Sequence, residues 1–122
     1  MPRKFMESMR YARKGIRHAF WTQRNIRIHL IIGTIVFAAG SYLRLDRNEF
    51  VALVITIGFV IMAEMLNTAI EEAVDLASPG RHEKATVAKD VAAGAVLFSV
   101  ICAIIVGCLI FIPHLAGPGR LP

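Results

Sequence analysis

The chain of 122 residues is 56% hydrophobic and only 19% charged, and its mean hydropathy is +0.57. This composition excludes an ordinary water-soluble domain, and the length allows one domain rather than several. The formal net charge of +5 is carried mostly by residues near the N-terminus. We therefore predict a single integral-membrane domain over residues 1–122.

The first segment, over about residues 3–24, is basic and has the pattern of an amphipathic helix. Its apolar residues recur with the period of one helix face: Phe5, Met9, Ala12, Ile16 and Phe20. This pattern predicts a helix in the headgroup layer of a membrane, with Trp21 as an interfacial anchor. A solvated topology signal is the alternative. No nucleic-acid partner is predicted, because no recognisable binding fold accompanies the basic residues.

Three apolar stretches follow and predict transmembrane helices over about residues 27–44, 49–73 and 88–112. A bilayer helix needs roughly 20 apolar residues. The third stretch is unbroken, the second ends in acidic residues, and the first is long enough only if it begins near Arg27 and His29. The predicted fold class is an all-α membrane protein with an N-terminal amphipathic surface helix and three transmembrane helices.

Basic residues are distributed unevenly around these spans. Eight of the fourteen lie at or before Arg27, three lie between positions 81 and 89, and the C-terminal tail has only Arg120. Because cytoplasmic segments of membrane proteins carry an excess of Lys and Arg, we expect the N-terminus and the 71–90 loop in the cytoplasm and the C-terminus outside.

The second apolar stretch carries a row of polar residues at its C-terminal end. At about 100° per residue, one helix sector of roughly 100° contains them all: Glu64, Asn67, Thr68, Glu71 and Asp75. Carboxylates at membrane depth are costly unless they are paired, coordinated or hydrated, so such a polar stripe predicts a functional site. The alternatives are an interhelical polar clamp, or a helix that leaves the bilayer early.

The depths of the two glutamates in this polar stripe suit different tasks. Glu71, near the interface, could hold a hard cation such as Mg²⁺ together with substrate phosphates. Glu64, deeper and desolvated, could act as a general base toward a group that resides in the lipid. The loop that follows offers His82, Lys89 and Asp90 as a polyphosphate clamp. Together they predict a nucleotide on the cytoplasmic side and an acceptor in the membrane.

The segment "EMLNTAIEEAVD" at 64–75 resembles the E-x-x-N-[ST]-A-I-E-x-x-V-D signature of the prokaryotic diacylglycerol kinase family, which includes the undecaprenol kinases. Three further segments resemble the family in the correct order: "YARKG", "RNIRIH" and "AKDVAAGAVL". The resemblance implies a homotrimer of three-span subunits in the bacterial plasma (inner) membrane, with each site shared between neighbouring chains.

The resemblance also implies roles for individual residues. Glu64 would be the catalytic base and Glu71 a metal ligand, with Asn67 and Asp75 as supporting polar groups. The residues that match nucleotide-contacting positions of the family are Tyr11, Gly80, Arg81, His82, Lys89 and Asp90.

Two positions depart from the family pattern. Lys4 replaces an Arg that contacts substrates, which keeps the charge and loses the bidentate geometry. Gln23, expected on the surface helix, replaces a Glu that shares the metal and contacts ATP. Glu72 could then turn in to supply the missing charge.

The function that these observations predict is ATP- and Mg²⁺-dependent phosphorylation of the hydroxyl of a membrane lipid alcohol, either undecaprenol or diacylglycerol. "RNIRIH" is more similar to the undecaprenol kinases, because the diacylglycerol kinases have a Glu at the position of His29. The alternative is a non-catalytic small membrane protein that keeps the kinase fold for assembly or lipid sensing, an interpretation that Gln23 favours.

Overall fold

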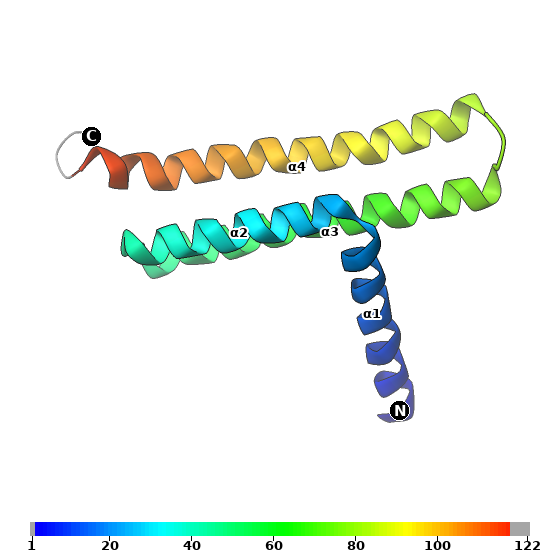
Figure 1. Ribbon diagram of the computed structural model, residues 1–122, viewed down its shortest axis with the longest axis horizontal. Helices are drawn as coiled ribbons and strands as arrows, with labels where there is room; N and C mark the ends of the chain where they lie inside the picture. The colour runs from blue at the N-terminus through cyan, green and yellow to red at the C-terminus, as the bar shows by residue number, and fades with distance from the viewer. Residues whose placement is uncertain (1, 118–122) are drawn as a thin grey trace.

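The computed structural model describes residues 2–117, and every regular element in this range is a helix. The helices are α1 (Pro2–Thr22), α2 (Arg24–Tyr42), α3 (Arg47–Ala77) and α4 (Glu83–Ala116). The tail with Arg120, which we expect outside the cell, lies outside the described residues. Figure 1 shows α2, α3 and α4 running alongside one another, whereas α1 leads away from them.

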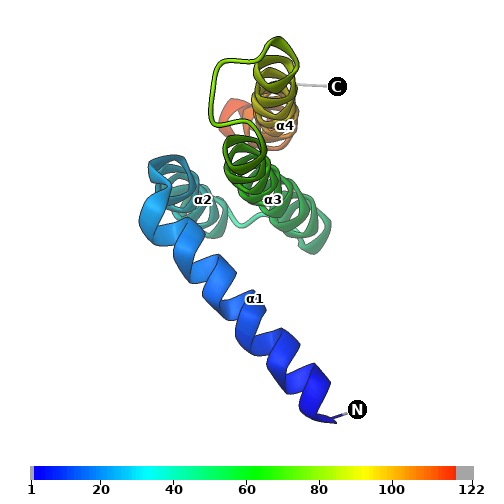
Figure 2. The ribbon, with the colours of Figure 1, turned by 90° about the vertical axis from the view of Figure 1, so that its right-hand side faces the viewer.

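Helices α2, α3 and α4 are each long and apolar enough to cross a membrane. This confirms the prediction of an all-α membrane protein with three candidate spans. The end-on view in Figure 2 places α3 between α2 and α4. The polar stripe therefore lies on the helix that contacts both of the other candidate spans.

Helices α3 and α4 are longer than the spans predicted from hydrophobicity. They contain 31 and 34 residues, whereas roughly 20 suffice to cross a bilayer. Hydrophobicity marks only the lipid-embedded part of a helix, and the N-terminal extension of α4 over residues 83–87 includes Glu, Lys and Ala, which favour helix. Helix α3 ends at Ala77, just before Ser78 and Pro79, because the residue preceding a proline disfavours helical backbone.

The junction between α1 and α2 differs from the prediction. Gln23 has extended backbone angles (φ −106°, ψ 109°) and lies between the two helices, so its expected place on the surface helix is wrong. Arg27 stabilises the break, because its Nη1 donates to the backbone oxygens of Phe20 at 2.8 Å and Trp21 at 2.9 Å. These carbonyls end α1 and have no partner within it.

At the opposite end of the bundle, α3 begins with a capping box in which Asp46 and Glu49 bond each other's backbone N–H groups. Glu49 also contacts α4, since its Oε1 lies 2.9 Å from His114 Nε2. Leu45, Leu53 and Ile110 form the buried apolar cluster here. This end of the molecule is fixed by contacts that are separate from the polar stripe.

Candidate active site

The polar stripe changes from buried to exposed along α3. Glu64 and Thr68 are 3% and 5% exposed, Asn67 and Glu71 are partly buried, and Asp75 is exposed. Glu64 is therefore the carboxylate most completely removed from solvent. The exposed end of the stripe points toward the connection between α3 and α4, where a water-soluble substrate could reach it.

Glu64 has a partner from another helix. Its Oε1 lies 3.3 Å from Nε2 of His29 on α2, and the two side chains are 4% and 21% exposed. From the sequence, His29 was expected at the start of the first span and as a difference between the two kinds of lipid kinase, and its contact with Glu64 was not predicted. A single sequence does not reveal which residues pair between spans, but an ionisable residue within a span already suggests a functional role.

Asn67 and Glu71 form the middle of the stripe. Asn67 Nδ2 donates to Glu71 Oε1 at 3.1 Å, and this bond orients the carboxylate. Asn67 Oδ1 is buried and has no hydrogen-bond partner in the described part of the chain. An oriented carboxylate beside an unused amide oxygen is an oxygen donor set that suits a hard cation.

The predicted Mg²⁺ site depends on the oxygen atoms that the side chains of Asn67 and Glu71 supply. Within residues 2–117, no three His, Cys, Asp or Glu side chains gather closely enough to hold a metal ion by themselves. Mg²⁺ is commonly held by one or two carboxylates together with substrate phosphates and water. Glu71, with the amide of Asn67 beside it, therefore fits a metal that is also held by substrate phosphates, and the described side chains form no metal cage by themselves.

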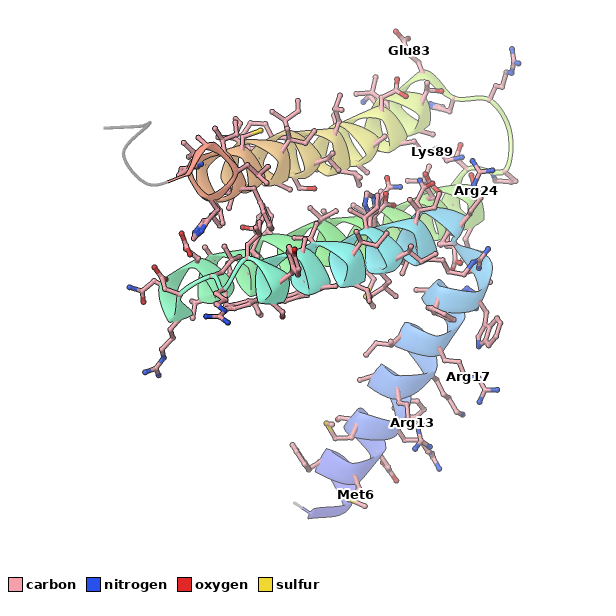
Figure 3. All side chains as sticks on the ribbon, turned by 60° about the vertical axis from the view of Figure 1, so that its left-hand side comes forward. Met6, Arg13, Arg17, Arg24, Glu83 and Lys89 are labelled. Carbon is pink, nitrogen blue, oxygen red and sulfur yellow. The ribbon has the colours of Figure 1, made fainter. Side chains whose placement is uncertain are left out.

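Lys89 lies next to the stripe, although it belongs to α4. It forms an ion pair with Asp75 that joins α4 to α3, and Figure 3 shows its side chain on the side of α4 that faces α3. Asp90, the next residue, is exposed. The structure thus brings a cation to the solvent-facing end of the row of carboxylates.

The connection between α3 and α4 contains the other loop residues predicted from the sequence. Gly80, Arg81 and His82 are all exposed. His82 also caps the N-terminus of α4, because its Nδ1 accepts a hydrogen bond from the backbone N–H of Lys84 at 3.1 Å. It therefore has a structural task in addition to the expected contact with nucleotide.

The residues predicted on α1 are not brought to Glu64 within one chain. Lys4 and Tyr11 are exposed, and the N-terminal half of α1 leads away from the other helices (Figures 1 and 2). The Tyr11 ring lies 5.4 Å from the Arg10 guanidinium carbon and 6.0 Å from Lys14 Nζ. This end of α1 presents an aromatic ring between two cations.

The end of α1 nearest the bundle is joined to α3. His18 Nε2 lies 2.9 Å from Glu72 Oε1, and both side chains are largely exposed. Glu72 therefore contacts α1 in this structure, which does not favour the alternative in which it turns toward Glu71. Gln23 lies partly buried at the nearby helix junction.

Comparison with known proteins identifies the family. The model of the prokaryotic diacylglycerol kinase family matches residues 10–111. The chain belongs to this family. A diacylglycerol kinase from Synechocystis sp. is 47% identical over 109 residues, which cover 88% of this chain and 62% of that protein. An undecaprenol kinase from Bacillus subtilis is 38% identical over 112 residues, which cover 92% of this chain and 91% of that protein.

A diacylglycerol kinase from Escherichia coli K12 is 29% identical over 111 residues, which cover 91% of each chain. The chain thus spans less than two thirds of the Synechocystis relative and nearly the whole of the other two. Among the residues predicted for the site, only Lys4 lies outside the segment that the diacylglycerol kinase family model matches. The resemblance seen in the signature is confirmed, and the named relatives are lipid kinases.

Proposed function

We propose that this chain is a lipid kinase that uses ATP and Mg²⁺ to phosphorylate the hydroxyl of a membrane lipid alcohol. The observation that best supports the proposal is the polar stripe on α3. It runs from the buried carboxylate of Glu64 to the exposed Asp75, which pairs with Lys89 of α4. A lipid hydroxyl reaches the buried end and a nucleotide reaches the exposed end. The names of the relatives support the same reaction.

Glu64 acts as the general base. It accepts the proton of the lipid hydroxyl while the hydroxyl oxygen forms a bond to the γ-phosphorus of ATP. The bond between that phosphorus and the bridging oxygen breaks, and ADP leaves. Because Glu64 is only 3% exposed, water has little access to the base, which favours transfer to a lipid over hydrolysis.

Glu71 and Gln23 would hold Mg²⁺, which when bound neutralises charge on the phosphates. Asn67 keeps Glu71 oriented through the bond from its Nδ2. Asp75 holds Lys89 at the solvent-facing end of the stripe, where the ammonium group can contact phosphate oxygens. The remaining nucleotide contacts are assigned to Tyr11, Gly80, Arg81, His82 and Asp90.

The position of α1 supports a site that is shared between chains. Lys4 and Tyr11 are exposed on a helix that leads away from Glu64, so they would serve a site on a neighbouring chain. We therefore propose a homotrimer with shared sites, as the family resemblance implies. The chain would lie in the bacterial inner membrane with its N-terminus in the cytoplasm, because the basic residues gather in α1 and before the third span.

The acceptor can be identified by offering dioleoylglycerol and undecaprenol side by side to the purified protein in mixed micelles with γ-labelled ATP. We expect undecaprenol to be the better acceptor, because His29 lies in the "RNIRIH" segment that resembles the undecaprenol kinases. Faster labelling of dioleoylglycerol would show that diacylglycerol is the preferred acceptor, and the proposed phosphoryl transfer would still hold. Labelling of neither lipid would favour the non-catalytic alternative, a small membrane protein that keeps the fold for assembly or lipid sensing.

Gln23→Glu should lower the concentration of free Mg²⁺ needed for half-maximal activity. A Gln oxygen can coordinate the metal but is neutral, and Mg²⁺ sites draw much of their affinity from carboxylate charge. The measurement is a Mg²⁺ titration at fixed ATP, with the lipid preference recorded as a control that should not change. An unchanged or higher Mg²⁺ requirement would show that Gln23 does not serve the metal.

A further inference from the structure

The contact between His29 and Glu64 occurs where α2 and α3 approach closely. Ile26 and Gly33, about one turn before and after His29 on α2, are both buried. A Cβ atom at Gly33 would lie only 3.0 Å from Ile57 Cγ2 on α3, so the missing side chain allows the two helices to come together. Packing of the backbones therefore fixes the position of His29 relative to Glu64.

Within the described residues, His29 is the only side chain capable of a positive charge within 4.0 Å of the Glu64 carboxylate. The neighbouring polar group of the stripe does not take this place, because Thr68 Oγ1 donates to the Glu64 backbone oxygen. A carboxylate in an apolar environment is costly unless a donor satisfies it. His29 Nε2 is the group positioned to do so.

His29 also borders open apolar space. It forms one end of a groove of about 370 Å³ between α2, α3 and α4, whose lining includes Ile32, Val60 and Ile104. His29 therefore lies between the carboxylate and the part of the bundle that an apolar molecule could enter. An apolar chain in this groove would therefore lie beside the residue that contacts Glu64.

We propose that His29 is a positioning residue for Glu64. In the reacting complex its Nε2–H would donate to Oε1 of Glu64, which lies 3.3 Å away in this structure, and would hold the group so that the other oxygen is free to accept the proton of the lipid hydroxyl. This inference rests on the proposed function, since it assigns His29 a role only if Glu64 is the base. The role differs from that of a substrate contact, because His29 acts through Glu64.

Three single variants test this role. His29→Leu removes the donor and should lower kcat by about 10- to 100-fold, the effect expected when a reacting group is misplaced by about 1 Å, with little change in the KM for ATP. His29→Gln supplies a side-chain N–H of similar reach and should restore at least a third of the lost activity on a logarithmic scale. His114→Leu is the matched control, because His114 pairs with Glu49 at the far end of the bundle and should keep parental kcat.

A double variant separates positioning from general support of the fold. On a Glu64→Gln background, adding His29→Leu should cause no further loss, because His29 acts through the carboxylate that is already absent. The proposal would be overturned if His29→Leu lowered kcat by the same factor in both backgrounds. It would also be overturned if His29→Leu kept near-parental kcat, or if His29→Gln restored no activity. If His29→Leu does not fold, the test uses His29→Gln, provided that this variant is stably folded. An activity of His29→Gln no higher than that of Glu64→Gln would then overturn the proposal.

The outcomes also separate this inference from the proposed function. Near-normal turnover of Glu64→Gln would mean that Glu64 is not the general base and would contradict the proposed mechanism. Loss of turnover in Glu64→Gln with normal turnover in His29→Leu would leave the mechanism intact and refute only the role of His29.

Discussion

Glu64→Gln should lower turnover by at least about 10²-fold, the lower end of what general bases contribute. The amide keeps the size of the side chain and a carbonyl oxygen opposite His29, so the packing between α2 and α3 should persist. It cannot accept the proton of a hydroxyl at a useful rate. The KM for ATP should change little, because Glu64 lies at the buried end of the stripe, away from the solvent-facing end.

Glu49→Gln is the matched control for this prediction. Glu49 is also a carboxylate on α3 that contacts a histidine, His114, but it lies at the other end of the helix. Its variant should retain parental turnover. If Glu64→Gln and Glu49→Gln lose the same fraction of activity, the effect comes from stability and Glu64 is a structural member of the stripe.

Glu71→Gln should lower activity by about 10²-fold or more at limiting Mg²⁺, because metal binding supplies several kcal/mol of charge stabilisation during phosphoryl transfer. The Gln oxygen can still accept the bond from Asn67 Nδ2 that Glu71 receives at 3.1 Å. The stripe should therefore remain folded while it loses a negative charge. A titration of activity against free Mg²⁺ should show partial recovery at high concentration, which distinguishes weak metal capture from loss of structure.

The neighbouring residue provides the control. Glu72→Gln changes the same charge one position along the chain, but Glu72 contacts His18 on α1. It should leave the Mg²⁺ requirement close to that of the parent. A larger shift for Glu72→Gln than for Glu71→Gln would mean that Glu72 serves the metal, and the contact with His18 would then have to open during the reaction.

The features that the sequence predicted well are those that depend on residue spacing along one helix. The 3.6-residue period of α1 and the three long apolar runs are local properties, so the helices and their order could be read directly. The stripe of Glu64, Asn67 and Glu71 is also defined by position on one helix. Its increasing exposure from Glu64 to Asp75 agrees with the depths expected from distance to the loop.

The features that the sequence missed depend on contacts between helices. Nothing in the order of residues indicates that His29 lies 3.3 Å from Glu64 or that Asp75 pairs with Lys89. The position of Gln23 was predicted wrongly because the break after Thr22 is stabilised by Arg27, which comes after it in the chain and bonds the last carbonyls of α1. From the 3.6-residue apolar period alone, α1 would be expected to continue past Thr22.

The continuity of α3 fixes the relative positions of the residues in the polar stripe. Because α3 continues to Ala77 as one helix, Glu64 and Glu71 stay on one face at a fixed separation of seven residues, roughly 10 Å along the axis. A buried carboxylate and a partly buried one are thus held in constant register. This spacing suits a reaction between a hydroxyl in the bilayer and a phosphate in water.

The central claim is that the γ-phosphoryl group of ATP passes to a lipid hydroxyl at Glu64. The most direct measurement follows label from the γ-phosphate after incubation of the purified protein in mixed micelles, with and without a lipid alcohol. We predict label in the extracted lipid for the parent, at least about 10²-fold less for Glu64→Gln, and little release of inorganic phosphate when lipid is omitted. Label that remains in ATP, that appears only as inorganic phosphate, or that enters lipid equally in both proteins would contradict the claim.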